Sequence, residues 1–224
     1  MSSAENHDGS SGQKSYTGWY AAGGFAVVAV IIGLWWTSTY NTQVNGRQDV
    51  YSQGAKAKLV VTRRNNVFVT QGAVVEAAAA NESGAQIAIA KARSEATAAF
   101  DLTKNIDVSK LAESKELQEQ FFKAMAAQQS AMLKIVAVRE AYPTIGATAA
   151  FLKFQDEVSG SENRINVEYA RWQNTINAYN KSLIGFFSSV VANHYGFKTL
   201  EYYEPPAGVD INTPPDLTRI LKRG

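Results

Sequence analysis

The strongest hydrophobic pattern in the chain is an apolar run near its start. The run WYAAGGFAVVAVIIGLWW extends from Trp19 to Trp36 without a charged side chain. As a helix, these eighteen residues would be about 27 Å long, close to the hydrocarbon thickness of a bilayer. The pattern predicts a transmembrane helix over residues 19–36. Aromatic residues, which favour the membrane interface, stand at its two ends: Trp19, Tyr20, Trp35, Trp36 and Tyr40.

Two other interpretations of the run are a buried helix of a soluble protein and a cleaved signal peptide. The second is disfavoured because TSTYNTQ, which follows the run, offers no cleavage site of small residues. One face of the predicted helix carries only small residues, which could let two such helices pair, although Ala and Gly are also common in unpaired spans. This face consists of Ala22, Ala26, Ala29 and Gly33.

Between Thr37 and Tyr203 the apolar residues recur at helical spacing. The only proline there is Pro143, and the region is rich in good helix formers. Two stretches alternate spacings of four and three residues, a repeat typical of helices that pack in bundles and coiled coils. They are Leu117, Phe121, Ala124, Gln128, Ala131, Ile135, Val138 and Tyr142, then Ile165, Tyr169, Trp172, Ile176, Tyr179, Leu183, Phe186 and Val190.

Turn-forming residues divide this region into four helices. Breaks at 81–84, near 105–109 and at Pro143 predict helices over roughly 37–80, 85–104, 110–141 and 147–194. Glycines 46, 54 and 72 are expected weak points in the first helix. Short connections make consecutive helices antiparallel. The sequence thus predicts an all-α protein, with an N-terminal transmembrane helix followed by an antiparallel four-helix bundle of long helices over residues 37–203.

The ends of the chain show no such pattern. Residues 1–18 are rich in Ser and Gly and predict a disordered leader. Residues 204–224 hold four of the five prolines and predict a flexible tail. That tail also carries Leu217, Ile220 and Leu221 among basic residues, so it could dock on a partner or on an anionic membrane surface.

The composition excludes several classes of function. Lys plus Arg number 22 and Asp plus Glu number 20, a balance that argues against nucleic-acid binding. Without cysteine there are no disulfides, thiolate metal sites or cysteine nucleophiles. Only His7 and His194 are histidines, and Val191 stands where a di-iron Glu-x-x-His motif needs its glutamate. We expect no catalytic residue, no cofactor, no metal site and no small-molecule substrate.

Charged residues on the predicted bundle helices suggest a polar network. Arg47 and Arg64 fall on the inner stripe of the first helix, with Val44, and Arg63 adjoins them. A buried arginine needs a carboxylate partner, for which the candidates on the last helix are Asp156, Glu157 and Glu162. The network either fixes the register of the helices or forms a partner site. The repeated Glu113, Glu116 and Glu119 are interpreted as a solvated helix face.

Several short motifs occur in order between residues 16 and 204. They are YNTQV (40–44), Arg47, Val50, Arg63–Arg64, Glu82, Ala92–Arg93, AYP (141–143), FL (151–152), QDE (155–157), ENRI (162–165), YN (179–180), GF (196–197) and YYE (202–204). Together these motifs resemble the LemA family of membrane-anchored bacterial helical bundles. Departures lie at Gly54, where the family usually has an aromatic residue, at Val67–Gly72, and at Asn81 in place of a frequent histidine.

The resemblance implies a single-pass protein of the bacterial inner membrane without established catalytic activity. We expect a non-catalytic scaffold or adaptor that binds other membrane-associated proteins. The alternative is a self-assembling structural protein of a specialised membrane, magnetosome-like or envelope; a hydrolase or metal enzyme is a third hypothesis. Expected partners are the lipid bilayer and a protein or a second copy.

The basic residues near the span favour a cytoplasmic bundle. Lys14 precedes the span, and Arg47 and Lys56 follow it, and basic residues near a span favour the cytoplasmic side.

Overall fold

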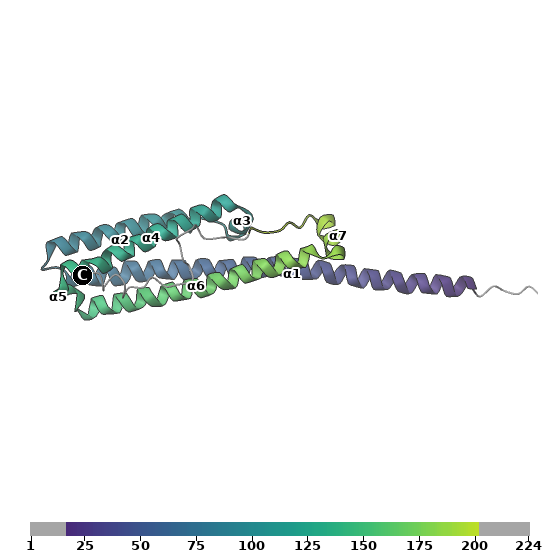
Figure 1. The fold of residues 1–224 in the computed structure, drawn as a ribbon, viewed down its shortest axis with the longest axis horizontal. Coiled ribbons are helices and arrows are strands. Elements are labelled where there is room, and N and C mark those ends of the chain that lie inside the picture. The colour runs from purple at the N-terminus through teal and green to yellow at the C-terminus, as the bar shows by residue number, and fades with distance from the viewer. Residues whose placement is uncertain (1–16, 202–224) are drawn as a thin grey trace, which may run out of the picture. The chain divides into compact units, whose positions relative to one another are not determined.

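The computed structural model describes residues 17–201, and within this range the regular structure is entirely helical (Figure 1). The predicted tail over 204–224, Lys14 and nearly all of the predicted leader lie outside the described residues. The chain divides into two compact units, residues 1–41 and 42–224. Helix α1, Thr17–Ala78, begins in the first unit and ends in the second.

The first unit holds the apolar part of α1. In the described part of the chain, α1 is the helix that is long and apolar enough to cross a membrane. It begins at Thr17, two residues before the predicted span. From Trp19 to Trp35 its side chains are exposed, including the four small residues of the predicted pairing face, and Trp36 is half-buried. A helix that exposes apolar side chains on all sides suits a lipid environment.

The second unit is an antiparallel helical bundle. Its long helices are the remainder of α1 with α2 (Ser83–Lys104), α4 (Lys115–Ala141) and α6 (Ala149–Ile184). Three short helices complete it: α3 (Val108–Glu113), α5 (Pro143–Gly146) and α7 (Phe186–Tyr195). In Figure 1, α2 and α4 lie side by side, and α5 lies at the opposite end of this unit from α7. The predicted all-α fold, with an apolar helix followed by packed helices, is confirmed.

Two apolar clusters fill the bundle. In the first, the rings of Phe68 on α1 and Phe154 on α6 lie 5.9 Å apart. In the second, Phe122 on α4 and Tyr169 on α6 meet edge to face at 4.8 Å. Edge-to-face pairs of this kind suit the ring quadrupoles. Between the two clusters, α1, α4 and α6 contribute buried polar residues, and these include the layer described below: Arg64, Asn65, Gln128, Ser161 and Glu162.

Two helix breaks depart from the predicted boundaries. Ser114 caps α4, its side chain accepting the Leu117 amide at 3.3 Å, so that α3 and α4 are separate helices. Gly185 has an extended backbone and separates α6 from α7. The prediction of one helix over 147–194 was therefore wrong. Beyond the break, Phe186 and Val190 are exposed, and Val191 and Ala192 are buried in their place.

The inner face of α1 also differs from prediction in two respects. Val44 is exposed and its neighbour Gln43 is fully buried. The glycines expected to weaken α1 leave it unbroken. Instead they admit close neighbours: a Cβ on Gly54 would lie 2.5 Å from Val108 Cγ1, and one on Gly72 would lie 3.0 Å from Arg93 Cδ. These glycines are sites of close helix approach.

Candidate functional site: a buried polar layer and an arginine groove

A buried polar layer crosses the bundle at Arg64. The Arg64 side chain is 1% exposed, and its Nη1 lies 2.9 Å from Glu162 Oε1 on α6. Its Nε and Nη2 donate to Gln128 Oε1 on α4 at 3.0 and 2.6 Å. Gln128 Nε2 in turn donates to Asn65 Oδ1 at 3.0 Å. Three long helices therefore share one hydrogen-bonded layer, which the sequence anticipated only in the pairing of an arginine with an acid of the last helix.

This layer separates the two apolar clusters and favours a single register. Arg64 lies between Val61 of one cluster and Phe68 of the other, and Glu162 lies between Val158 and Ile165 in the same way. A shift of one helix would bury the guanidinium or the carboxylate against apolar side chains, which is costly. In the described part of the chain, no side-chain atom of this layer is left buried without a partner.

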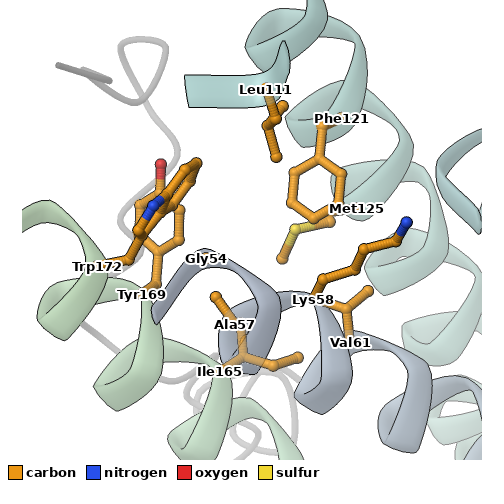
Figure 2. Close-up of a pocket in the computed structure, with 10 residues that line it drawn as sticks. All are labelled: Gly54, Ala57, Lys58, Val61, Leu111, Phe121, Met125, Ile165, Tyr169 and Trp172. Carbon is orange, nitrogen blue, oxygen red and sulfur yellow. The ribbon is translucent and has the colours of Figure 1, made fainter. Parts of the chain in front are cut away.

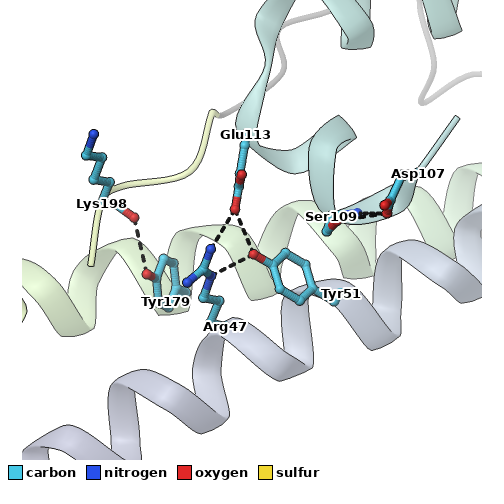
Figure 3. Close-up of polar contacts among 7 residues, drawn as sticks. All are labelled: Arg47, Tyr51, Asp107, Ser109, Glu113, Tyr179 and Lys198. Carbon is cyan, nitrogen blue, oxygen red and sulfur yellow. Dashed lines mark hydrogen bonds and ion pairs between the residues drawn. The ribbon is translucent and has the colours of Figure 1, made fainter. Parts of the chain in front are cut away.

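A second polar cluster lies near the start of the bundle (Figure 3). Arg47 Nη2 lies 2.7 Å from Glu113 Oε1, and the Tyr51 hydroxyl donates to the same oxygen at 2.8 Å. Arg47 Nε donates to the Tyr51 oxygen at 2.6 Å. Arg47 is half-exposed and pairs with Glu113 of α3, so its predicted pairing with an acid of the last helix was wrong. Glu113, Glu116 and Glu119 are all exposed, as the interpretation of a solvated helix face predicts.

Hydrogen bonds set the protonation of this cluster. Those from Arg47, and then from Tyr51, lower the pKa of the Glu113 carboxyl below its ordinary value. Burial, followed by the bond to Glu113, raises the pKa of Tyr51. Glu113 is therefore ionised and Tyr51 neutral at neutral pH, which is the arrangement in which the three groups satisfy one another.

An apolar pocket lies between α1, α3, α4 and α6 (Figure 2). Its volume is about 10 Å³, which is room for one water molecule at most. Gly54 and Trp172 line it, and Trp172 Nε1 is buried without an acceptor among residues 17–201. The Trp172 ring lies beside Gly54, the position at which the family that the sequence resembles usually has an aromatic residue. This pocket is a packing feature of the core.

A larger groove, of about 360 Å³, lies over α1 and α6 beside the polar layer. We call it the arginine groove; it is lined by Val60, Arg63, Asn66, Val67, Ser161 and Arg164. Arg63 and Arg164 are exposed, and neither has an ion-pair partner within the described range. Among residues 17–201, no acidic residue lines the groove. It therefore presents two cationic groups beside two valines.

The remaining predicted site residues fall outside this groove. Asp156 is exposed and Glu157 half-buried on α6, and neither forms an ion pair in the part of the chain that the structure describes. Arg164 was absent from the predicted site. Its place in the ENRI motif, two residues after the ion-paired Glu162, is the signal that could have pointed to it. Among residues 17–201, no cluster of His, Asp and Glu could hold a metal ion.

Comparison with protein families agrees with this architecture. The model of the LemA family matches residues 54–217, which begin within α1 and include α2 to α7. The YNTQV motif and the apolar run precede the matched range. Comparison with curated proteins gave no match. Because the family match covers well over half of the sequence, the chain belongs to the LemA family.

Proposed function

We propose that this LemA-family chain is a non-catalytic adaptor whose arginine groove binds an acidic segment of another membrane-associated protein. The apolar part of α1, together with the family, indicates a membrane-anchored protein. The proposal places it in the bacterial inner membrane with the bundle in the cytoplasm. The observation that carries the proposal is the pair of cations, Arg63 and Arg164, in a groove to which the described residues contribute no acidic side chain.

The chemistry of the groove suits carboxylates. A guanidinium binds a carboxylate through two parallel hydrogen bonds, so two arginines can hold two acidic side chains in a defined orientation. Val60 and Val67 add apolar surface to the lining of the groove, and Asn66 adds an exposed amide. The Ser161 hydroxyl donates to the carbonyl of Val158 at 2.8 Å, so the groove's donors are the arginines and Asn66.

The buried layer behind the groove supports recognition by fixing its width. Arg63 adjoins Arg64, and Ser161 adjoins Glu162, so the 2.9 Å ion pair ties the two walls of the groove together. A site whose walls are held before binding loses less conformational entropy when its ligand arrives. The LemA family is not known as an enzyme family, which also favours a binding role.

Site-specific photocrosslinking at Asn66, in cells expressing the full-length protein at its native level, tests the proposal. We expect a defined crosslinked protein whose attached segment is acidic. The double substitution Arg63→Glu and Arg164→Glu should abolish this crosslink by charge repulsion. Reversing the acidic residues of the captured segment to lysine should restore it, because the charge pairing is then re-formed with opposite signs.

A matched control changes the same charge elsewhere. Lys123 on α4 and Lys153 on α6 are exposed, so Lys123→Glu with Lys153→Glu alters the net charge equally without touching the groove. The crosslink should survive in this variant. Capture of lipid alone, of another copy of this chain, or of a protein whose crosslink resists the groove reversal would each contradict the proposal.

A further inference from the structure

The end of α6 and helix α7 carry an exposed apolar surface that is not packed into the bundle core. Ile184 is 71% exposed, Phe186 is 80% exposed and Val190 is 51% exposed. Phe186 and Val190 are one helical turn apart and so share a face. The opposite face of α7 is buried through Val191 and Ala192. The helix thus packs by one side and presents apolar side chains on the other.

Polar contacts fix α7 at the start of the bundle. Gln43 on α1 is fully buried, and its Nε2 donates to the carbonyl of Ser188 at 2.9 Å. After α7, Asn180 on α6 holds Leu200 through two hydrogen bonds, one to its amide at 2.8 Å and one to its carbonyl at 2.9 Å. The Tyr179 hydroxyl donates to the carbonyl of Lys198 (Figure 3). The segment is therefore held at both of its ends.

The covalent chain keeps this surface near the membrane. Gln43 follows Trp36, the last residue of the apolar run, by seven residues. Seven residues span at most about 25 Å even when fully extended, whatever the orientation of the two units. The surface hydrogen-bonded to Gln43 is thus tethered to the end of the apolar run by a link of at most about 25 Å.

The composition of the segment fits a lipid interface. Helix α7, FFSSVVANHY, contains no Lys, Arg, Asp or Glu. Exposed lysines flank it, Lys181 three residues before Ile184 and Lys198 three residues after Tyr195. Apolar and aromatic side chains bordered by basic residues are typical of segments that lie in the headgroup region, where anionic lipids attract the cations.

From this placement and composition we infer that the exposed apolar surface formed by Ile184, at the end of α6, with Phe186 and Val190 on α7 inserts into the lipid interface as a second membrane contact. The partner is the bilayer in which α1 is anchored. This contact is separate from the arginine groove, and it would orient the bundle on the membrane surface.

Spin labelling of the full-length protein in nanodiscs tests the inference. The chain has no cysteine, so Val190→Cys and Lys123→Cys each give one labelled site, at α7 and at exposed α4. The nanodiscs consist of phosphatidylcholine with phosphatidylglycerol. Each disc holds one copy of the protein, which excludes self-association. We expect the Val190 label to collide mainly with oxygen, which concentrates in lipid, and the Lys123 label mainly with a water-soluble nickel chelate.

A second variant separates lipid insertion from burial of the label against protein. Ile184→Ser with Phe186→Ser should expose the Val190 label to the nickel chelate as fully as the Lys123 label. The matched control, Val74→Ser with Ile87→Ser, changes exposed apolar residues of α1 and α2 and should leave the Val190 signal unchanged. Free access of the chelate to Val190 in the unsubstituted background would overturn the inference. So would a label shielded from both reagents, which would indicate a protein contact.

Discussion

Arg64 is the side chain whose removal should destabilise the bundle most. The Arg64 side chain is 1% exposed. Among residues 17–201, it is the only cation within ion-pair distance of Glu162. Arg64→Met leaves the carboxylate buried without compensation, which costs about 3–5 kcal/mol. Chemical unfolding of the detergent-solubilised protein measures this loss. Arg63→Met, at an exposed neighbour, should change the free energy of unfolding by less than about 0.5 kcal/mol.

The double variant Arg64→Met with Glu162→Leu distinguishes a lost ion pair from lost packing. Because it removes both charges, its free energy of unfolding should lie above that of Arg64→Met alone. If the double variant is the less stable of the two, the pair is not the source of the penalty.

Glu113 should contribute a small, pH-dependent part of the stability. Its pKa is lowered, first by Arg47 and then by Tyr51, from an ordinary value of 4.5. A lowered pKa stabilises the fold above pH 4.5, and that stabilisation is lost as the pH falls through the pKa of the folded state. Since the pair is half-exposed, the effect should stay below about 1 kcal/mol.

Thermal unfolding between neutral and acidic pH measures the Glu113 contribution. Glu113→Gln cannot lose a proton, so its unfolding temperature should fall less steeply on acidification than that of the unsubstituted protein. Other carboxylates titrate in both proteins and cancel in the comparison. Parallel curves would show that the cluster adds nothing to stability.

Helix α1 packs closely against α3 and α6 at Gly54, where a larger residue would not fit without movement. A Cβ on Gly54 would lie 2.5 Å from Val108 Cγ1 and 2.9 Å from Trp172 Nε1, so Gly54→Ala forces a neighbour to move. We expect a loss of about 1–3 kcal/mol in the free energy of unfolding. Val108→Ala in the same chain should recover part of it by removing the atom closest to the new methyl group.

Gly160 on α6 provides the matched control for Gly54. Its added Cβ would meet the Arg164 guanidinium at ordinary contact distances, 3.5 Å to Nη2 and 4.0 Å to Cζ. Alanine is favoured over glycine within a helix, so Gly160→Ala should stabilise the protein by about 0.5–1 kcal/mol. If Gly54→Ala lowers the free energy of unfolding and Gly160→Ala raises it, close packing is distinguished from helix propensity. If both substitutions change it in the same direction, the close packing inferred at Gly54 is contradicted.

The helical repeats predicted the packed elements better than they predicted where those elements end. From Ile165 to Leu183 every member of the α6 repeat is buried, because a 3.5-residue stripe must face other helices. The repeat continues past Gly185, yet Phe186 is exposed. A single glycine costs a helix only about 1 kcal/mol, so the sequence does not show whether the helix bends there. The helix position after the break depends on tertiary contacts that the repeat does not reveal: the hydrogen bond from Gln43 to Ser188 and the burial of Val191.

The candidate site was predictable where it depended on burial, and otherwise only at Arg63, which adjoins Arg64 in the sequence. An arginine on an inner stripe requires an acid, which led to Arg64 and Glu162. Arg47 followed the same stripe but lies where the bundle is more open, and the break at Ser114 places Glu113 beside it. The arginine groove arises from two exposed residues of different helices, Arg63 and Arg164, and exposed residues carry no periodic signal.

At the scale of the whole molecule, the side of the membrane on which the bundle lies is decided by few charges. Arg47 and Lys56 follow the apolar run within twenty residues and Lys14 precedes it, so the excess of basic residues on the bundle side is one. Basic residues near a span are retained in the cytoplasm. We therefore expect the bundle to be cytoplasmic and the N-terminus to be outside.

Cysteine labelling in intact cells tests this orientation, because the chain has no cysteine of its own. Ser10→Cys, before the span, should react with a membrane-impermeant thiol reagent, whereas Lys123→Cys, exposed on α4, should react only after the membrane is permeabilised. The reverse pattern would put the arginine groove outside the cytoplasm, and the search for its acidic partner would then move to envelope proteins. The α7 inference holds in either orientation, since its tether to the span is the same on both sides.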